Sequence, residues 1–345
     1  MTPEEIFKIL SQIKYPGFSR DIVSFGLIKG VEIKDKTIHI SIAYTTESPE
    51  KRNQIEQLIR ESIRPIFSNA IQFDMIENPV RPAADRATLE QKPVPGVKTI
   101  IAVASGKGGV GKSTVAVNLA CALQVIGKKV GLLDCDIYGP SIPMMMGIQE
   151  RPALTPTNRL IPHFKHGVHM MSLGFFMEGD NPVIWRGPMV TGAIRQLLYD
   201  TEWKDLDVLI VDLPPGTGDA QLSLVQLVPL RGAVIVTTPQ DVALIDAKKG
   251  VVMFQKLNVE ILGIIENMSY FVCPHCQEKT DIFREGGGHR EAERMKVPFL
   301  GKIPLEAAVR AGGDEGVPIV VRDSSSDITK AFLEAAKVVS QKIDF

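Results

Sequence analysis

The glycine-rich stretch SGKGGVGKST, residues 105–114, follows an apolar run and precedes residues that favour a helix. It satisfies the pattern G-x-x-x-x-G-K-[ST] with Gly106, Gly111, Lys112 and Ser113. Glycines let backbone N–H groups turn toward phosphate oxygens, and the helix N-terminus adds its positive dipole. Lys112 would neutralise the β- and γ-phosphates, and the Ser113 hydroxyl would ligate Mg²⁺. The pattern predicts a nucleotide site, with ATP the expected nucleotide; a glycine turn without a ligand is the alternative. We expect phosphate contacts from Gly106, Gly108, Gly109, Val110, Gly111, Lys112, Ser113 and Thr114.

Acidic residues end two further apolar runs. Asp212 closes DVLIVD, and Asp134 and Asp136 close LLDCD. A carboxylate at the place of Asp212 can hold a Mg²⁺-bound water, and the PPGTG that follows it can move with the γ-phosphate as a switch. Capping of the next helix is the alternative role of such acids.

A close pair of cysteines, Cys273 and Cys276, forms the motif CPHC. Two thiolates suit zinc or an iron–sulfur cluster, and each of these usually takes four ligands. His275 and His289 are the nearest candidates to complete a zinc site, but their spacing fits no standard pattern. A two-fold dimer would supply four thiolates. Three interpretations follow: a cluster bridging two subunits, a structural zinc, or thiol–disulfide redox chemistry.

The elements that must position these residues are apolar runs separated by helical stretches. Continuous β-branched runs are typical of parallel strands buried on both faces, and their alternation with helices predicts a doubly wound, mainly parallel α/β sheet. Ligands in such sheets bind beyond the carboxyl ends of the strands, where the glycine loop and Asp212 fall. The runs are Ile100–Ala104, Val130–Leu133, Val168–Leu173, Val208–Val211, Ala233–Thr237, Ile261–Ile265 and Phe299–Ile303.

The pattern of apolar residues over 1–80 is different and predicts a small α+β domain. Residues 81–98 belong to a polar, proline-bearing stretch that resists regular structure and is expected to be a linker. Residues 99–345 then form the large α/β domain. The elements expected in the small domain are a helix over Pro3–Ile13, strands over Ile22–Leu27, Val31–Ile33 and Thr37–Ala43, a helix over Asn53–Ile66 and a strand over Ile71–Ile76.

The last stretch, Asp327–Ile343, has apolar residues at helical spacing. Because it lacks a dense basic face, a helix packed on the sheet is favoured over a helix lying on a membrane surface.

Charge and composition exclude several function classes. The chain has 39 Lys and Arg against 40 Asp and Glu, a net charge of −1 that provides no global attraction for nucleic acid or an anionic membrane. No apolar run is long enough to span a bilayer, and the acidic start is unlike a secretory signal. Cys121 and Cys135 lie in apolar segments and are expected to be buried thiols. The cytoplasm is the expected location.

The form K-G-G-x-G-K-[ST], with a second lysine at Lys107, resembles the deviant Walker A loop of the MinD/ParA-type dimerising ATPases. The resemblance implies that Lys107 reaches across a dimer interface to the partner's nucleotide, and that Asp136 orients the attacking water. It also implies that Asn267, in GIIENMSYF, contacts adenine; the donor and acceptor edges of its amide suit a purine. A turn-forming asparagine is the alternative.

Taken together, SGKGGVGKST, DCDIYGPSIP, VIWRGPM, DLPPGTGD, ENMSYFVCPHC, GGGH and IPL resemble the Mrp/Nbp family of iron–sulfur cluster carriers over about residues 98–345. The resemblance implies a slow ATPase that holds a [4Fe–4S] cluster between two subunits at Cys273 and Cys276. It also implies a cluster donor and apo-protein recipients. RDIVSFGLIKGVEI and SIAYTT resemble the iron–sulfur-assembly domain often fused ahead of bacterial members. That domain commonly has a cysteine where this chain has Ser48, which favours a docking role over thiol chemistry.

The competing function is that of a MinD/ParA-like regulatory or positioning ATPase, which recruits partners to membrane or DNA and has a structural zinc at CxxC. Such a protein would share the phosphate loop, Lys107 and Asp136, but it would have no need for CPHC. The stretch from Trp185 to Pro188 belongs to the family pattern. We assign no chemical role to it and expect it to connect a strand to a helix, with Pro188 at the helix start.

Overall fold

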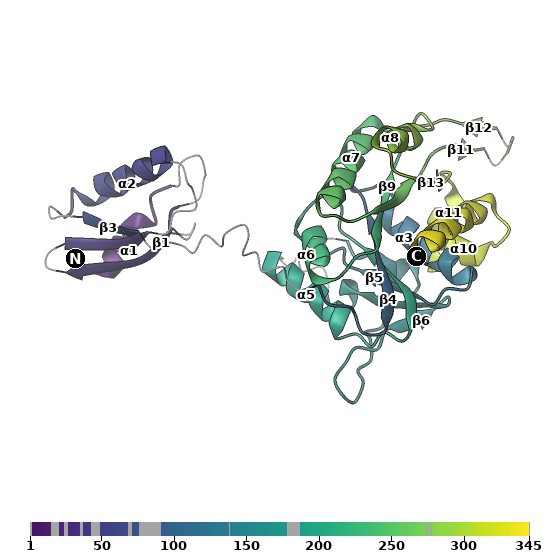
Figure 1. Ribbon diagram of the computed structural model, residues 1–345, viewed down its shortest axis with the longest axis horizontal. Helices are drawn as coiled ribbons and strands as arrows, with labels where there is room; N and C mark the ends of the chain where they lie inside the picture. Colours follow the sequence, from purple (N-terminus) through teal and green to yellow (C-terminus); the bar gives the residue numbers. More distant parts are fainter. Residues whose placement is uncertain are drawn as a thin grey trace. The chain divides into compact units, whose positions relative to one another are not determined.

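The computed structural model describes residues 2–14, 21–23, 27–34, 37–42, 49–67, 71–75, 91–137, 139–177, 187–273, 275–276 and 278–344. The chain divides into two compact units, residues 1–88 and 89–345, and each is described by itself. Figure 1 shows the helices and strands of both units.

In its described residues, the first unit has a three-stranded sheet and two helices. Strands β1 and β2 are antiparallel, and β2 and β3 are parallel. Thr2 caps the first helix with two reciprocal hydrogen bonds. Its backbone N–H donates to the Glu5 carboxylate, and its hydroxyl accepts a hydrogen bond from the Glu5 backbone N–H. Ile22 and Leu27 are buried in the core, but the described residues of the strand expected over Ile22–Leu27 form no strand. The elements are α1 Pro3–Leu10, β1 Ile28–Lys34, β2 Thr37–Ile42, α2 Pro49–Ile63 and β3 Ile71–Met75.

The second unit is built on an eight-stranded sheet with the order β13-β10-β9-β4-β8-β5-β7-β6. All neighbouring strands are parallel except the edge strand β6, which is antiparallel to β7. Every apolar run named above contributes a strand, so the predicted doubly wound, mainly parallel fold is confirmed. The strands are β4 Val97–Ala104, β5 Val130–Asp134, β6 His163–Lys165, β7 Val168–Ser172, β8 Leu206–Asp212, β9 Gly232–Thr237, β10 Ile261–Glu266 and β13 Phe299–Lys302.

Helices cover both faces of this sheet. In Figure 1, α5 to α8 lie on one side, and α3, α10 and α11 lie on the other. The short strands β11 Phe271–Val272 and β12 Lys279–Thr280 form a separate ribbon. The helices are α3 Lys112–Val125, α4 Ile142–Met145, the 3-10 helix η1 Leu173–Phe176, α5 Gly187–Tyr199, α6 Asp219–Leu227, α7 Asp241–Lys256, α8 Gly287–Met295, α9 Ala307–Glu315, α10 Ile319–Arg322 and α11 Asp327–Ile343.

The C-terminal helix α11 packs on the body of the protein, chiefly along α3 and β13. Ser326 caps it by accepting a hydrogen bond from the Thr329 N–H. Its apolar face, including Phe332 and Val339, is fully buried. The apolar face of α11 is therefore part of the core, which is the packed role favoured by the sequence.

This packing predicts that Phe332→Ala lowers the free energy of unfolding by about 3 to 5 kcal/mol, because a fully buried aromatic ring leaves a cavity. The matched change Lys337→Ala, on the exposed face of the same helix, should alter it by less than about 0.5 kcal/mol. Urea unfolding followed by circular dichroism measures both, and equal effects would contradict this placement of α11.

Candidate functional site

The glycine loop connects the end of β4 to the start of α3. Gly109 and Gly111 have positive φ angles of 80° and 76°, a conformation that residues with a Cβ rarely adopt. A Cβ on Gly111 would also collide with the side-chain amide of Asn267, and one on Gly106 would collide with the backbone of α7. The glycines are therefore required both for the turn and for the close approach of neighbouring elements.

A cluster of charged and polar side chains closes the base of this loop. The Lys112 Nζ donates to Asp212 Oδ1 at 2.6 Å, and the Ser113 hydroxyl donates to Asp212 Oδ2 at 2.6 Å. Asp136 lies on the open side, with its Oδ2 3.5 Å from the Lys112 Nζ. Burial raises the pKa of Asp212, while the Lys112 charge acts in the opposite direction. The structure thus brings Lys112, Ser113, Asp136 and Asp212 together.

Asp134 lies beside Asp212 in the sheet and holds the loop after β5. Its carboxylate accepts hydrogen bonds from the backbone N–H of Asp136 at 3.0 Å and of Ile142 at 3.3 Å, and from the Ser172 hydroxyl at 3.0 Å. Complete burial, and then the neighbouring charge of Asp212, raise the pKa of Asp134 to about 7. Its contacts fix the backbone that carries Asp136.

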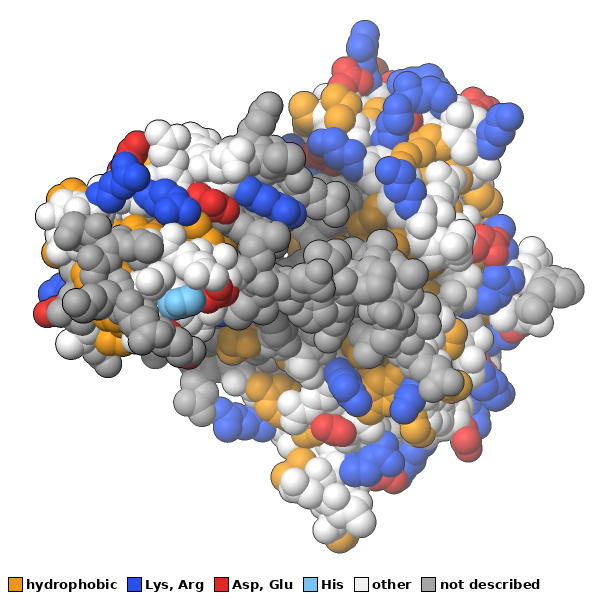
Figure 2. Space-filling model, turned by 60° about the vertical axis from the view of Figure 1, so that its left-hand side comes forward, with side chains coloured by type: hydrophobic (Ala, Val, Ile, Leu, Met, Phe, Trp, Pro, Cys, Tyr) orange, Lys and Arg blue, Asp and Glu red, His pale blue; other side chains and the backbone are white. Residues whose placement is uncertain are grey.

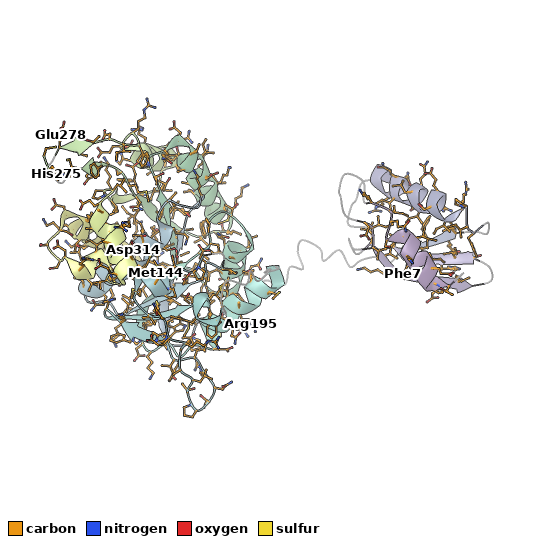
Figure 3. All side chains as sticks on the ribbon, turned by 180° about the vertical axis from the view of Figure 1, so that it is seen from behind. Phe7, Met144, Arg195, His275, Glu278 and Asp314 are labelled. Carbon is orange, nitrogen blue, oxygen red and sulfur yellow. The ribbon has the colours of Figure 1, made fainter. Side chains whose placement is uncertain are left out.

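Two adjoining cavities lie over the loop. The first, of about 370 Å³, is lined by the phosphate loop, Asp136 and Pro215 of the PPGTG segment. The second, of about 250 Å³, is lined by Asn267, by Leu305 and by residues of α9. Thr114 and Met145 line both, so the two cavities are adjacent, and together they are called the nucleotide groove below. Figure 3 labels Met144 and Asp314, which line the second cavity.

A larger hollow of about 610 Å³ lies between α5 and α6, where Tyr199 and Arg195 line it. Figure 3 labels Arg195. It contains none of the motif residues. We place the candidate site at the smaller groove, because convergent lysine, hydroxyl and carboxylate groups are what a nucleotide needs, and volume alone is not.

Asn267 follows β10 and faces the phosphate loop. Its side-chain nitrogen donates to the carbonyl of Val110 at 2.9 Å, and its backbone N–H donates to Thr237 at 2.8 Å. Its position in the wall of the second cavity is compatible with an adenine contact, and its place in a turn is compatible with the alternative role. The contact with Val110 was not foreseen from the sequence.

The cysteine pair lies at the tip of the β11–β12 ribbon. The Cys273 N–H donates to the Glu278 carbonyl at 3.0 Å, which closes the hairpin. Figure 3 shows His275 and Glu278 at this tip, away from the sheet. Cys273 is half-buried and Cys276 is exposed. Backbone N–H groups of Cys276 and His275 that point at the Cys273 sulfur lower the pKa of that thiol. Both thiols are therefore accessible, and the lowered pKa of Cys273 favours its thiolate.

The other two cysteines are of a different kind. Cys121 and Cys135 are fully buried, as the sequence predicted, and burial raises the pKa of Cys121 to about 12. Neither can reach the ribbon tip without unfolding the core. Within the described residues, no group of three or more His, Cys, Asp or Glu is placed to hold a metal ion, so neither His275 nor His289 completes a single-chain site.

Three further buried polar residues lie close to the site and were not among the predicted site residues. Ser172 holds Asp134, as described above. Gln221 donates to the carbonyls of Pro214 and Gly216 at 2.7 and 3.0 Å, which braces the PPGTG loop. Glu266 ends β10 and is fully buried. A signal existed for Glu266 alone: like Asp212, it is an acid at the end of an otherwise apolar strand.

The fold and this groove define the class of a P-loop NTPase. Residues 96–340 match the family model described as NUBPL iron-transfer P-loop NTPase, and the chain belongs to that family. Residues 3–70 match the model of an iron-sulfur cluster assembly protein. The resemblance to iron–sulfur carrier proteins noted from the motifs is confirmed by these matches. Ser48, Trp185 and Arg186 lie outside the described residues.

Known relatives agree with this assignment. The iron-sulfur cluster carrier protein of Synechocystis sp. is 43% identical over 99% of this chain and 98% of its own. The mouse iron-sulfur cluster transfer protein NUBPL is 50% identical over 75% of this chain and 82% of its own. A nucleotide-binding protein from Archaeoglobus fulgidus, solved with ADP, is 38% identical, with a TM-score of 0.60 over 69% of this chain and 93% of its own. The cell division ATPase MinD of Pyrococcus furiosus, 24% identical with a TM-score of 0.54, is alike in fold.

The ribbon geometry predicts the pH dependence of thiol alkylation. In the metal-free protein, Cys273 should react with iodoacetamide with a pH midpoint below the ordinary thiol value of about 8.5, because its lowered pKa leaves thiolate at lower pH. Mass spectrometry of each labelled cysteine measures this. Cys121 and Cys135 are internal controls that should react only after denaturation. A midpoint for Cys273 at or above the ordinary value would contradict the contacts described.

Proposed function

We propose that this protein is an iron–sulfur cluster carrier that binds and slowly hydrolyses ATP, holds a [4Fe–4S] cluster between two copies of the chain, and passes it to apo-proteins. The observation that carries the proposal is the accessible pair Cys273 and Cys276, which begins six residues after Asn267 of the nucleotide groove. The names of the relatives, an iron-sulfur cluster carrier protein and an iron-sulfur cluster transfer protein, support an iron–sulfur cargo.

The nucleotide would lie along the groove with its phosphates on the glycine loop and its base beside Asn267. This orientation fits ATP, as does the ADP bound by the Archaeoglobus fulgidus relative. The oxygens of Ser113 and Asp212, 2.6 Å apart, are the hard donors that Mg²⁺ prefers. Ser113 would hold the metal directly and Asp212 through a water, and the ion would neutralise phosphate charge during transfer.

Hydrolysis would use Asp136 and Lys107. Asp136 lines the phosphate cavity and is positioned by Asp134, so its carboxylate can orient a water toward the γ-phosphate. Lys107 is exposed at the rim of the same cavity and forms no ion pair with the described part of the chain. A lysine in that position is available to the nucleotide of a second copy. Turnover would be slow, because the nucleotide acts as a timing device for cluster handling.

A homodimer follows from the ligand requirement. A [4Fe–4S] cluster takes four ligands, and one chain offers two accessible thiols, since Cys121 and Cys135 are buried in the core. Exposed apolar side chains flank the phosphate loop: Val242 and Ile245 lie on α7 beside the Asp246 backbone that Gly106 touches. Together with Lys107 they form a surface suited to a second copy of the same chain.

The partners would be a scaffold or other cluster donor and apo iron–sulfur proteins, with the first unit serving to dock them in the cytoplasm. Figure 2 shows basic and acidic side chains interspersed with apolar ones on one face. With a net charge of −1, this pattern favours protein partners over nucleic acid or a membrane surface. Among the described helices, none combines the length and hydropathy that a bilayer crossing needs.

Anaerobic reconstitution with iron and sulfide tests the cargo. We expect about four irons and four sulfides per dimer, with dimer mass measured by light scattering. Cys276→Ala should lose the cluster and keep its fold, while Cys121→Ala, at a buried thiol, should retain the full iron and sulfide content. Zinc bound without sulfide would instead make CPHC structural, and the protein would then be a MinD/ParA-like regulatory ATPase.

Two lysine variants separate binding from hydrolysis. Lys112→Ala should weaken ADP binding by at least about tenfold, because its charged hydrogen bonds to phosphate are lost. Lys107→Ala should keep ADP affinity yet lower ATP hydrolysis by about a thousandfold, the scale of a charge supplied in trans. Titration calorimetry and phosphate release measure these quantities, with the exposed Lys337→Ala as control. Wild-type hydrolysis by the Lys107 variant would exclude its role across the dimer.

A further inference from the structure

The fully buried carboxylate of Glu266 collects three hydrogen bonds at the end of β10. The Ser269 hydroxyl donates to Oε1 at 2.5 Å, and the Gly286 N–H donates to the same oxygen at 2.9 Å. The Gly288 N–H donates to the other oxygen, Oε2. A buried carboxylate is tolerated only where donors of this kind satisfy it. Glu266 belongs to neither the nucleotide groove nor the cysteine pair.

These contacts hold together the two ends of the segment that carries the cysteines. The segment from Ser269 to Gly286 leaves the sheet, forms the β11–β12 ribbon with its cysteines, and returns. Both of its ends are bound to one oxygen atom of Glu266. The position of the ribbon relative to the sheet is therefore set at this carboxylate.

The glycines of the GGGH motif make the approach possible. A Cβ on Gly288 would lie 3.1 Å from the Cβ and Oε2 of Glu266 and 3.3 Å from a methyl group of Thr237. A Cβ on Gly287 would lie 2.7 Å from Leu244 and 2.9 Å from the Pro239 carbonyl. Without these side chains, the N-terminus of α8 reaches the carboxylate, and its dipole favours the negative charge. The motif thus allows the three hydrogen bonds to Glu266, which we call the clamp.

The same strand end also leads to the nucleotide. Asn267, the next residue, is bonded to the phosphate loop through the Val110 carbonyl. A displacement of Asn267 by a nucleotide would be passed through one peptide unit to Glu266, and from there to both ends of the ribbon. Along this path Asn267, Glu266 and Ser269 are buried, and hydrogen bonds join Asn267 to the phosphate loop and Glu266 to the ribbon ends.

We propose that Glu266 is a positioning residue that couples nucleotide occupancy to the exposure and geometry of Cys273 and Cys276. This regulation deepens the proposed function, because it assigns the ribbon as the element that responds to ATP. The proposal does not require that the cargo be a [4Fe–4S] cluster, because it concerns how exposed the two thiols are and how they are placed, whatever they bind.

The test is the alkylation rate of Cys273 and Cys276 in the full-length, metal-free protein, with and without Mg-ATP. In the wild type we expect nucleotide to change the rate by about fivefold or more. Glu266→Gln should keep ADP affinity and lose that change, because the amide nitrogen replaces one acceptor and faces a backbone donor. Ser269→Ala removes one of the three bonds and should reduce the change while leaving a stable fold.

A matched control lies on the flank of the ribbon. Glu285 pairs with Lys279 at 2.6 Å and with Lys302 at 2.8 Å, so Glu285→Gln weakens ion pairs of the ribbon and removes none of the three hydrogen bonds to Glu266. It should retain the nucleotide response. A full response in Glu266→Gln, or equal loss in Glu285→Gln, would overturn the assignment. If Glu266→Gln does not fold, an unchanged response in Ser269→Ala overturns it.

The two proposals fail separately. A wild-type protein whose thiols do not respond to nucleotide, but which binds iron and sulfide, would overturn the coupling and leave the carrier function intact. Thiols that respond through Glu266 in a protein that binds no sulfide would support the coupling and exclude the cargo.

Discussion

The charge of Lys112 is the constraint on which the site depends. Its ammonium group is almost completely buried, so it must have an anionic partner, and Asp212 supplies one at 2.6 Å. The pairing is possible because β4 and β8 are adjacent and parallel, which places the end of β8 beside the start of α3. A phosphate entering the loop competes with Asp212 for the same ammonium group. In the proposed function, binding of a nucleotide would thereby be transmitted to the PPGTG segment that follows Asp212.

The order of the strands places the other site residues along the same edge of the sheet as Lys112 and Asp212. The carboxyl ends of β10, β9, β4, β8 and β5 are consecutive neighbours, so the loops that follow them lie along one edge. Asp134 and Asp212 occupy register positions on adjacent strands, and Asn267 follows β10, two strands away from β4. The cysteine ribbon leaves the sheet from that same strand. The topology therefore brings the nucleotide groove and the ribbon base together without any direct contact between phosphate and thiol groups.

Sequence alone predicted the features that are local. The glycine loop, the apolar strands and the acids at their ends are short patterns whose residue types follow from the backbone geometry they need. The role of Glu266 could not be predicted, because its partners Gly286 and Gly288 are about twenty residues away along the chain and meet it only in the folded protein. The three-residue strand β6 was also missed, since His163–Lys165 is too short to show a period.

The contrast between the rigid base and the exposed tip of the ribbon has a chemical consequence. At the base, three donors bind the fully buried carboxylate of Glu266, so in our proposal a movement of Glu266 is passed on to the ribbon. At the tip, backbone N–H groups lower the pKa of Cys273, and Cys276 is open to solvent. Thiolates held this way can bind a metal cluster, yet they leave it within reach of another protein. A carrier needs both properties, because a cluster enclosed in the core, where Cys121 and Cys135 lie, could not be handed on.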